Sequence, residues 1–354
     1  MLAPDHAVDA TVRPDAVRQR YPAHVFQLER EWMHAEAMRG ELASADRLFD
    51  PLIQQASSEL ERAELYRLKA QLDTYHGRTH EAIAAGLAGL KPLGVELHPR
   101  PDPALVEADA LALAAAFAAV ADADPGDFDP AQFDHNPDNL AAADTATNLR
   151  VALIATDPDL ALGTGPAPGV LEVLLNRRET ADPRVATIAE LLAATAPAAM
   201  FTDTRLAYRI YMHLVHLWLQ HGPTRATAYG LAGYGLYLAG ARRDFASAFV
   251  FGQLALRLRD RLPDPAQGAR MLHIVGGLIT GWTQPFATAA ATLERGYSVG
   301  VQTGDFAAAT YNATTVVLVL VASRRSLSQM RSTAEQLLLA ARPILEVYGS
   351  GIIR

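Results

Sequence analysis

The sequence predicts an all-α protein, a right-handed α-solenoid built from stacked antiparallel helix pairs. Three observations carry this prediction. Alanine and leucine, both good helix formers, dominate a chain of 354 residues of which 50% are hydrophobic. Positions in the C-terminal half recur with a period of about 41 residues. Strand signals are absent, since the apolar run at 151–154 has neither polar alternation nor a partner run.

The 41-residue repeat is the most specific of these signals. Three copies share the start and end of a first helix, the start of a second helix, and two positions within the second helix. These positions are Pro223, Asp264 and Asp305; Gly240, Gly281 and Ala322; Phe245, Phe286 and Leu327; Ala248, Ala289 and Met330; and Leu256, Tyr297 and Leu338. Helices are therefore expected at 223–240 with 244–261, 264–281 with 285–302, and 305–322 with 326–342. One such pair cannot bury its apolar face alone, so neighbouring pairs must stack.

Local signals agree with these helix boundaries. Asp264 and Asp305 can accept hydrogen bonds from the first N–H groups of the helices that follow them. Gly240 and Gly281 stand where the end of a helix favours a residue in the left-handed conformation. Gly252 has an alanine four residues before it and another three residues after it, which predicts a close approach of two helices.

The chain divides into four segments by composition and pattern. Residues 1–22 are expected to form an N-terminal tail, 23–100 the N-terminal helical repeats, 101–182 an insert or hinge, and 183–354 the C-terminal helical repeats. In the N-terminal repeats the amphipathic stretches 45–56 and 62–75 precede a break at 76–78 and another helix at 81–93. The insert holds 15 acidic and 3 basic side chains and many prolines. It is expected to form a helix near 104–121, with a second helix possible near 139–155, and otherwise irregular chain.

Composition excludes several classes of protein. The chain has no cysteine, which excludes disulfides, thiolate metal sites and cysteine nucleophiles. Its first 20 residues lack the apolar run of a signal peptide, and the apolar stretches 110–121 and 316–322 are shorter than the roughly 20 residues that span a bilayer. A net charge of −8, concentrated in the middle of the chain, argues against nucleic acid as a partner. The protein is therefore expected to be cytoplasmic, with no membrane and no nucleic acid among its partners.

The chain lacks the motifs that would assign it an enzymatic reaction. There is no Gly-Lys-Ser/Thr triplet, and the glycine-rich stretch 163–169 contains two prolines and follows no strand, so an ordinary loop is favoured over a phosphate loop. No Gly-x-Ser-x-Gly elbow occurs. His213, His216 and His221 lie close together, but no carboxylate stands at ligand spacing in the same helix. The sequence predicts no catalytic residue, no metal site and no cofactor.

One polar stripe suggests a binding surface. Arg209, His213, His216 and Gln220 recur at four, three and four residues, which places them on one face of a helix. Such a stripe can line the groove of a solenoid, and Tyr229 belongs to a nearby group of aromatic residues typical of binding surfaces. These five residues form the predicted partner-binding groove. The alternatives are a plain solvent face for the stripe and a core position for the aromatic residues.

Residues 77–87 follow the pattern Gly-Arg-x-x-Glu-Ala-Ile-x-x-Gly-Leu. Together with the stretches 45–49, 62–66, 198–203, 228–236 and 249–256, they resemble one family, the tetratricopeptide-like helical-repeat region of large bacterial multidomain signalling proteins. In that family the repeats accompany a Ser/Thr kinase domain, an AAA/STAND-type signal-transduction ATPase, and often a GAF domain and a histidine kinase. The acidic insert is longer than the family pattern, and the kinase and ATPase parts are not in this chain.

The resemblance implies a non-catalytic region that binds a protein partner or a small effector and relays the change to attached ATPase or kinase domains. The chain would then be a fragment or a short product of such a gene. A passive structural spacer between catalytic domains is the alternative, and an enzyme built on an α/α array is the less favoured one.

Overall fold

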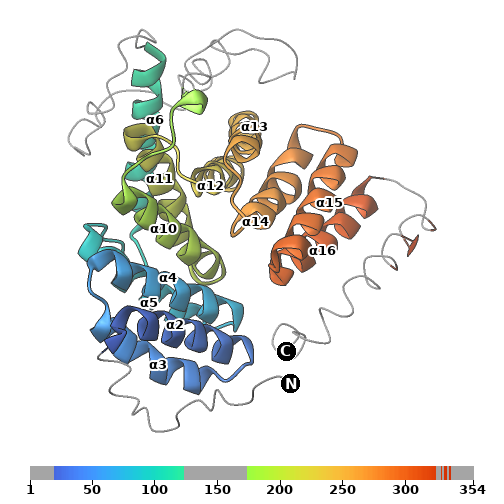
Figure 1. Ribbon diagram of the computed structural model, residues 1–354. Helices are drawn as coiled ribbons and strands as arrows, with labels where there is room; N and C mark the ends of the chain where they lie inside the picture. Colours follow the sequence, from blue (N-terminus) through green and yellow to red (C-terminus); the bar gives the residue numbers. More distant parts are fainter. Residues whose placement is uncertain (1–19, 123–173, 324–327, 329–330, 333–334, 336–354) are drawn as a thin grey trace, which may run out of the picture.

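The computed structural model describes residues 20–122, 174–323, 328, 331–332 and 335, and every secondary-structure element in these ranges is a helix (Figure 1). The all-α prediction is confirmed for this part of the chain. The expected helix near 139–155, most of the one expected at 326–342, and the glycine-rich loop at 163–169 lie outside the described residues.

The N-terminal helices form the lower part of the view in Figure 1. They are α2 (Pro22–Met38), α3 (Leu42–Gln55), α4 (Glu59–Tyr75) and α5 (Thr79–Leu90), followed by the short η1 (Lys91–Leu93). Helix α2 packs on α3, and α4 packs on α5. Ser58 caps α4 by accepting a hydrogen bond from the Glu61 N–H, and Gly77 makes the turn into α5 with a φ of +74°. The helices expected at 45–56, 62–75 and 81–93 are thus present, and each begins a few residues earlier than expected. Helix α2 was not among the expected helices.

Three helices follow in the middle of the molecule. They are α6 (Pro103–Asp122), α10 (Pro183–Thr202) and α11 (Thr204–His221). The helix expected near 104–121 is therefore confirmed. Helix α10 packs on α4 and α5 as well as on α11, and α6 packs on α11. The residues on either side of 123–173 consequently share one hydrophobic core with the N-terminal helices.

Helix α10 corrects one expectation from the sequence. It is long and apolar enough to cross a membrane by length and composition, although the sequence was expected to contain no such stretch. About 67% of its apolar window is buried inside the protein. Because α10 contacts α4, α5 and α11 on several sides, its apolar side chains are covered by other helices of the protein.

The C-terminal half follows the 41-residue period. Its helices are α12 (Thr227–Gly240), α13 (Phe245–Arg261), α14 (Gly268–His273), α15 (Phe286–Thr303) and α16 (Phe306–Ala322). Between α14 and α15 the chain continues through a π-helical stretch, η4 (Ile274–Ile279), and the short η5 (Thr280–Trp282). Helix α12 packs on both α11 and α13, α14 packs on α15, and α15 packs on α16. Most helices therefore have their main contacts with neighbours in chain order.

The sequence predicts the hydrogen-bond acceptors at the helix starts but not the backbone conformations at the helix ends. Asp305 accepts a hydrogen bond from the Ala308 N–H, and Asp264 accepts from the Gln267 N–H. The expectation of left-handed glycines at Gly240 and Gly281 is wrong, because neither has a positive φ. After α12 it is Arg243 that reverses the chain, with a φ of +55°.

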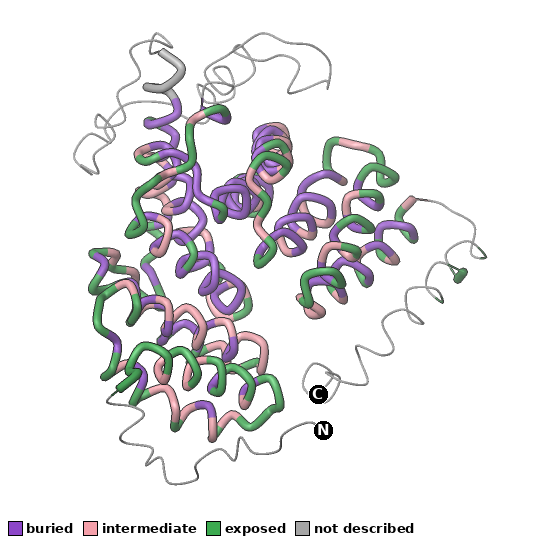
Figure 2. Tube along the Cα trace, viewed as in Figure 1, coloured by how far each residue is buried: buried purple, intermediate pink, exposed green. Residues whose placement is uncertain are grey.

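Burial is highest in the central helices, as Figure 2 shows, whereas α2 and α3 are largely exposed. The helices approach most closely where glycines face large side chains. A Cβ on Gly233 of α12 would lie 2.1 Å from the ring of Tyr211, and one on Gly86 of α5 would lie 2.0 Å from the hydroxyl of Thr195. Gly252 does not mark such a contact, because the nearest atoms to its Cβ would be 3.5 Å away.

Candidate functional site

The structure places the predicted groove residues at different depths. Arg209 of α11 forms an ion pair with Asp109 of α6, with 2.6 Å between Nε and Oδ2. His213 and Gln220 are half-buried, whereas His216 is 8% exposed. Tyr229 is 3% exposed and lies in the core, where its hydroxyl is 3.3 Å from that of Tyr211. A direct contact of Tyr229 with a partner would need a different arrangement of its neighbours, and the groove itself stays a prediction.

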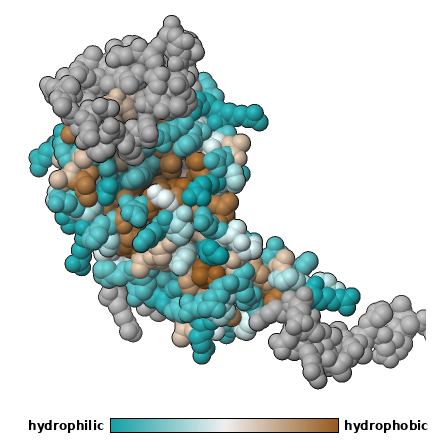
Figure 3. Space-filling view, turned by 90° about the vertical axis from the view of Figure 1, so that its left-hand side faces the viewer, coloured by the Kyte–Doolittle hydropathy of each residue, from teal (hydrophilic) through white to brown (hydrophobic). Residues whose placement is uncertain are grey.

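Helix α6 covers part of the polar stripe and neutralises basic residues beside it. Glu107 accepts hydrogen bonds from Arg242 at 2.8 and 3.0 Å. Burial, and then the charge of Glu107, raise the pKa of Tyr237 to about 12. The acidic segment of the sequence thus meets the basic C-terminal part through α6. Figure 3 shows a face on which hydrophobic residues gather in one region that is bordered by hydrophilic residues.

A second polar region lies where α4 and α10 face the start of α14. We call it the polar junction and define it by Glu64 and Arg67 of α4, Glu190 of α10, Arg225 before α12, and Asp264 before α14. Arg67 is ion-paired with Glu64, and its Nε lies 3.7 Å from the nearest carboxylate oxygen of Glu190. Arg225 lies 3.9 Å from Glu179. Residues far apart in the sequence therefore form one cluster of acidic and basic side chains.

The carboxyl groups of the polar junction have pKa values that are shifted in different directions. Partial burial, together with the charges of Glu64 and Asp264, raises the pKa of Glu190, and Arg67 only partly offsets this. Burial also raises the pKa of Asp264, although two backbone N–H groups and the charges of Arg225 and Arg67 oppose it. In contrast, the hydrogen bond from Arg67 holds the pKa of Glu64 below its usual value. Two of the three carboxylates are thus destabilised as anions.

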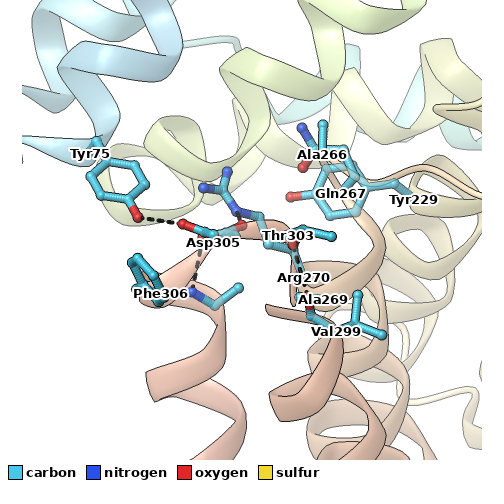
Figure 4. Close-up of polar contacts among 12 residues, drawn as sticks. Tyr75, Tyr229, Ala266, Gln267, Ala269, Arg270, Val299, Thr303, Asp305 and Phe306 are labelled. Atoms are coloured by element: carbon cyan, nitrogen blue, oxygen red, sulfur yellow. Dashed lines mark hydrogen bonds and ion pairs between the residues drawn. The ribbon is translucent and has the colours of Figure 1, made fainter. Parts of the chain in front are cut away.

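Arg270 of α14 is the centre of a neighbouring group of side chains, shown in Figure 4. Its Nε donates to Asp305 at 2.8 Å, and the two side chains are only 19% and 11% exposed. Burial lowers the pKa of Arg270, but the charge and the hydrogen bond of Asp305, together with Tyr229 and Tyr75, outweigh burial and leave the pKa raised. Tyr75, at the end of α4, donates its hydroxyl to the carbonyl oxygen of Gly304 at 3.1 Å. This bond joins the N-terminal helices to the turn between α15 and α16.

Gln267 completes the Arg270 site, which we define as Tyr75, Tyr229, Gln267, Arg270 and Asp305. Gln267 is 3% exposed, and its buried carboxamide oxygen has no hydrogen-bond partner among the described residues. Arg270 follows three residues later, so both side chains lie on the same side of this helix start. Figure 4 shows Tyr75 and Tyr229 on opposite sides of Arg270.

No protein-family model matches the sequence. Comparison with curated proteins and with solved structures also finds no match. The polar junction and the Arg270 site are therefore assigned from the geometry of this chain alone.

Sequence reasoning did not identify either region as a site. Asp264 and Asp305 were predicted as helix caps. This role is confirmed for Asp305, whereas Asp264 accepts hydrogen bonds from the Ala266 and Gln267 N–H groups directly before α14. Asp264 lies near Arg67, about 200 positions earlier in the sequence, and no spacing in the sequence predicts that proximity. Asp305 pairs with Arg270 because α14 packs on α16. The one available signal was Arg270 itself, a charged side chain within an otherwise apolar stretch.

Proposed function

We propose that the chain is a regulatory binding region, a right-handed tetratricopeptide-like α-solenoid that binds a protein segment or a small effector. The packing of most helices on neighbours in chain order supports a solenoid, as does the agreement of α12 to α16 with the 41-residue period. Binding would be relayed to attached ATPase or kinase domains.

The observation that carries this proposal is the origin of the residues in the polar junction. Glu64 and Arg67 come from the N-terminal helices, whereas Arg225 and Asp264 come from the C-terminal half. An occupant that touches both sets contacts two parts of the molecule at once. Its binding energy can then favour one relative position of these parts over another. A binding region of this kind needs no catalytic residue to transmit a signal.

The test uses the purified chain and separately produced ATPase or kinase domains encoded in the same reading frame. Association is measured by isothermal titration calorimetry for the unchanged chain, for Arg67→Glu, and for the control Arg295→Glu. Arg295 lies on α15 outside the junction and is 52% exposed. We expect binding to be lost in Arg67→Glu and kept in Arg295→Glu, because only Arg67 is held among the junction carboxylates.

The passive spacer predicts a different result. Neither charge reversal would then change association, or the nucleotide hydrolysis of the attached domains, and this outcome would refute the binding proposal. Loss of binding in both variants would place the contact elsewhere and would likewise count against the junction.

A further inference from the structure

Helix α2 carries apolar residues on two of its faces. Its inner face, which includes Met33 and Ala37, is buried against α3 and α4. A second set of apolar residues follows the spacing 4, 3, 4, 3 along the opposite face, and the contact positions of a two-helix coiled coil have this spacing. We call this set the α2 stripe and define it by Tyr21, Val25, Leu28, Trp32 and Ala35.

The large side chains of the α2 stripe are open to solvent. Tyr21 is 47% exposed, Leu28 69% and Trp32 54%. Apolar residues that are exposed side by side mark interaction sites, and the end helices of a repeat array normally present a polar outer face to water. The indole N–H of Trp32 donates to Glu36 at 3.1 Å, which orients this ring on the exposed face. The stripe therefore has the composition and the order of a docking surface.

The order of side-chain sizes along the α2 stripe reads alike from both ends. Two aromatic residues, Tyr21 and Trp32, enclose two aliphatic residues, Val25 and Leu28. When two copies of α2 lie antiparallel, the contact positions pair so that Tyr21 faces Trp32 of the second copy and Val25 faces Leu28 of the second copy. A second copy of the chain thus matches the stripe from one aromatic residue to the other.

Charge complementarity favours the same antiparallel orientation. Polar residues flank the stripe on its two sides, His24 and Glu31 on one and Glu29 and Glu36 on the other. In the antiparallel pair, His24 lies beside Glu31 of the second copy, twice by symmetry, and Glu29 lies beside Pro22. A parallel pair would instead place Glu31 beside Glu36 of the second copy, again twice, and like charges at these positions are unfavourable.

We propose that the α2 stripe joins two copies of this chain into an antiparallel dimer with two-fold symmetry. Both copies use the same surface in such an interface, so the pairing closes at two copies. One helix from each copy buries less than roughly 1,200 Å², so we expect a weak dimer with a Kd of about 10–100 µM. The stripe shares no residue with the polar junction, and the dimer therefore does not depend on the proposed function.

Sedimentation velocity of the full chain over a concentration series measures the dimer. Leu28→Glu should weaken it about tenfold or more, because each copy would then bury an unpaired carboxylate in the interface. Leu318→Glu is the matched control, since Leu318 lies on α16 and is 63% exposed, close to the value for Leu28. This control should dimerise like the unchanged chain. Both positions are exposed, so both variants should keep the fold, which circular dichroism checks.

An exchange of charges tests the orientation of the two helices. His24→Glu would face Glu31 of the second copy and should weaken the dimer about three- to tenfold. Combining it with Glu31→Lys restores a pair of opposite charges and should recover the dimer of the unchanged chain. Glu31→Lys alone should not strengthen an antiparallel dimer, whereas it would strengthen a parallel one by removing the contact between Glu31 and Glu36.

Four outcomes would overturn the proposal. The first is a chain that stays monomeric throughout the concentration series. The second is a dimer that is lost in Leu318→Glu and kept in Leu28→Glu, which would place the contact on α16. The third is growth beyond two copies, which would indicate head-to-tail association. The fourth is a double variant that fails to recover the dimer, which would exclude the antiparallel pairing of His24 with Glu31.

Discussion

Replacement of Gly233 by alanine tests one of the closest helix contacts among the described residues. Gly233 lies on α12 where it crosses α11, and an added Cβ would be 2.1, 2.2 and 2.5 Å from three atoms of the Tyr211 ring. Tyr211 is fully buried and cannot swing into solvent without leaving a cavity. Overpacking of this kind costs about 1–3 kcal/mol, and sometimes more. Alanine gains about 1 kcal/mol over glycine in a helix, so we expect a net loss of up to about 2 kcal/mol.

Gly252→Ala is the matched control, because Gly252 also lies inside a helix but has room for a methyl group. The nearest atoms to its Cβ would be at 3.5 Å, in Val275 and Ile279. This variant should gain about 0.5–1 kcal/mol from helix propensity alone. Urea unfolding followed by circular dichroism gives both values from the shift of the midpoint at constant slope. If Gly233→Ala proves as stable as Gly252→Ala, then α11 and α12 do not cross as described.

Three further predictions concern charged and polar groups. Asp73 is fully buried between Lys69, at 2.7 Å, and Arg78, so Asp73→Ala should destabilise the N-terminal helices by about 3 kcal/mol; unchanged hydrogen exchange in α4 and α5 would contradict this. Asp264→Asn keeps a side-chain oxygen that can accept from the Ala266 and Gln267 N–H groups but removes a carboxylate whose pKa is raised by burial. Because the pKa of Asp264 is raised in the folded chain, ionisation of its carboxyl group destabilises the fold, and the variant should be more stable than the unchanged chain at pH 7. This difference in stability should shrink as the pH falls through the raised pKa. A difference that does not depend on pH in urea unfolding would refute the assignment. Tyr75→Phe removes the hydrogen bond to Gly304 and should lower the stability of this contact by about 1 kcal/mol. The loss should appear as faster hydrogen exchange at the turn between α15 and α16. Unchanged exchange there would show that this contact is not formed in solution.

The sequence was sufficient for the parts of the fold that depend on local signals. The 41-residue period located α12 to α16 to within a few residues, because caps such as Asp305 and short turns act within one helix. It did not locate α10, since an alanine-rich helix buried on several sides shows little amphipathic pattern. Nor did it predict the π-helical stretch of η4, which no residue type marks in the sequence.

The burial of the predicted groove residues could not be predicted in the same way, because most of them were chosen from one helix. Periodicity alone placed Arg209 and His216 on a common face of α11, but it could not show that α6 would cover Arg209. Tyr229 was placed in the groove by composition, and the structure places it in the core beside Tyr211. The Arg270 site could be found only by knowing which helices that are distant in the sequence face each other.

The most direct test of the account is the distance between the end of α4 and the turn after α15, since the polar junction exists only if these parts meet. The chain has no cysteine, so His80→Cys and Gln302→Cys give a unique pair of spin labels at exposed positions. They stand five and two residues from Tyr75 and Gly304, which are joined by a hydrogen bond. Double electron–electron resonance should therefore give one narrow distribution below about 40 Å. A broad distribution extending well beyond that distance would show that the two halves do not form the junction.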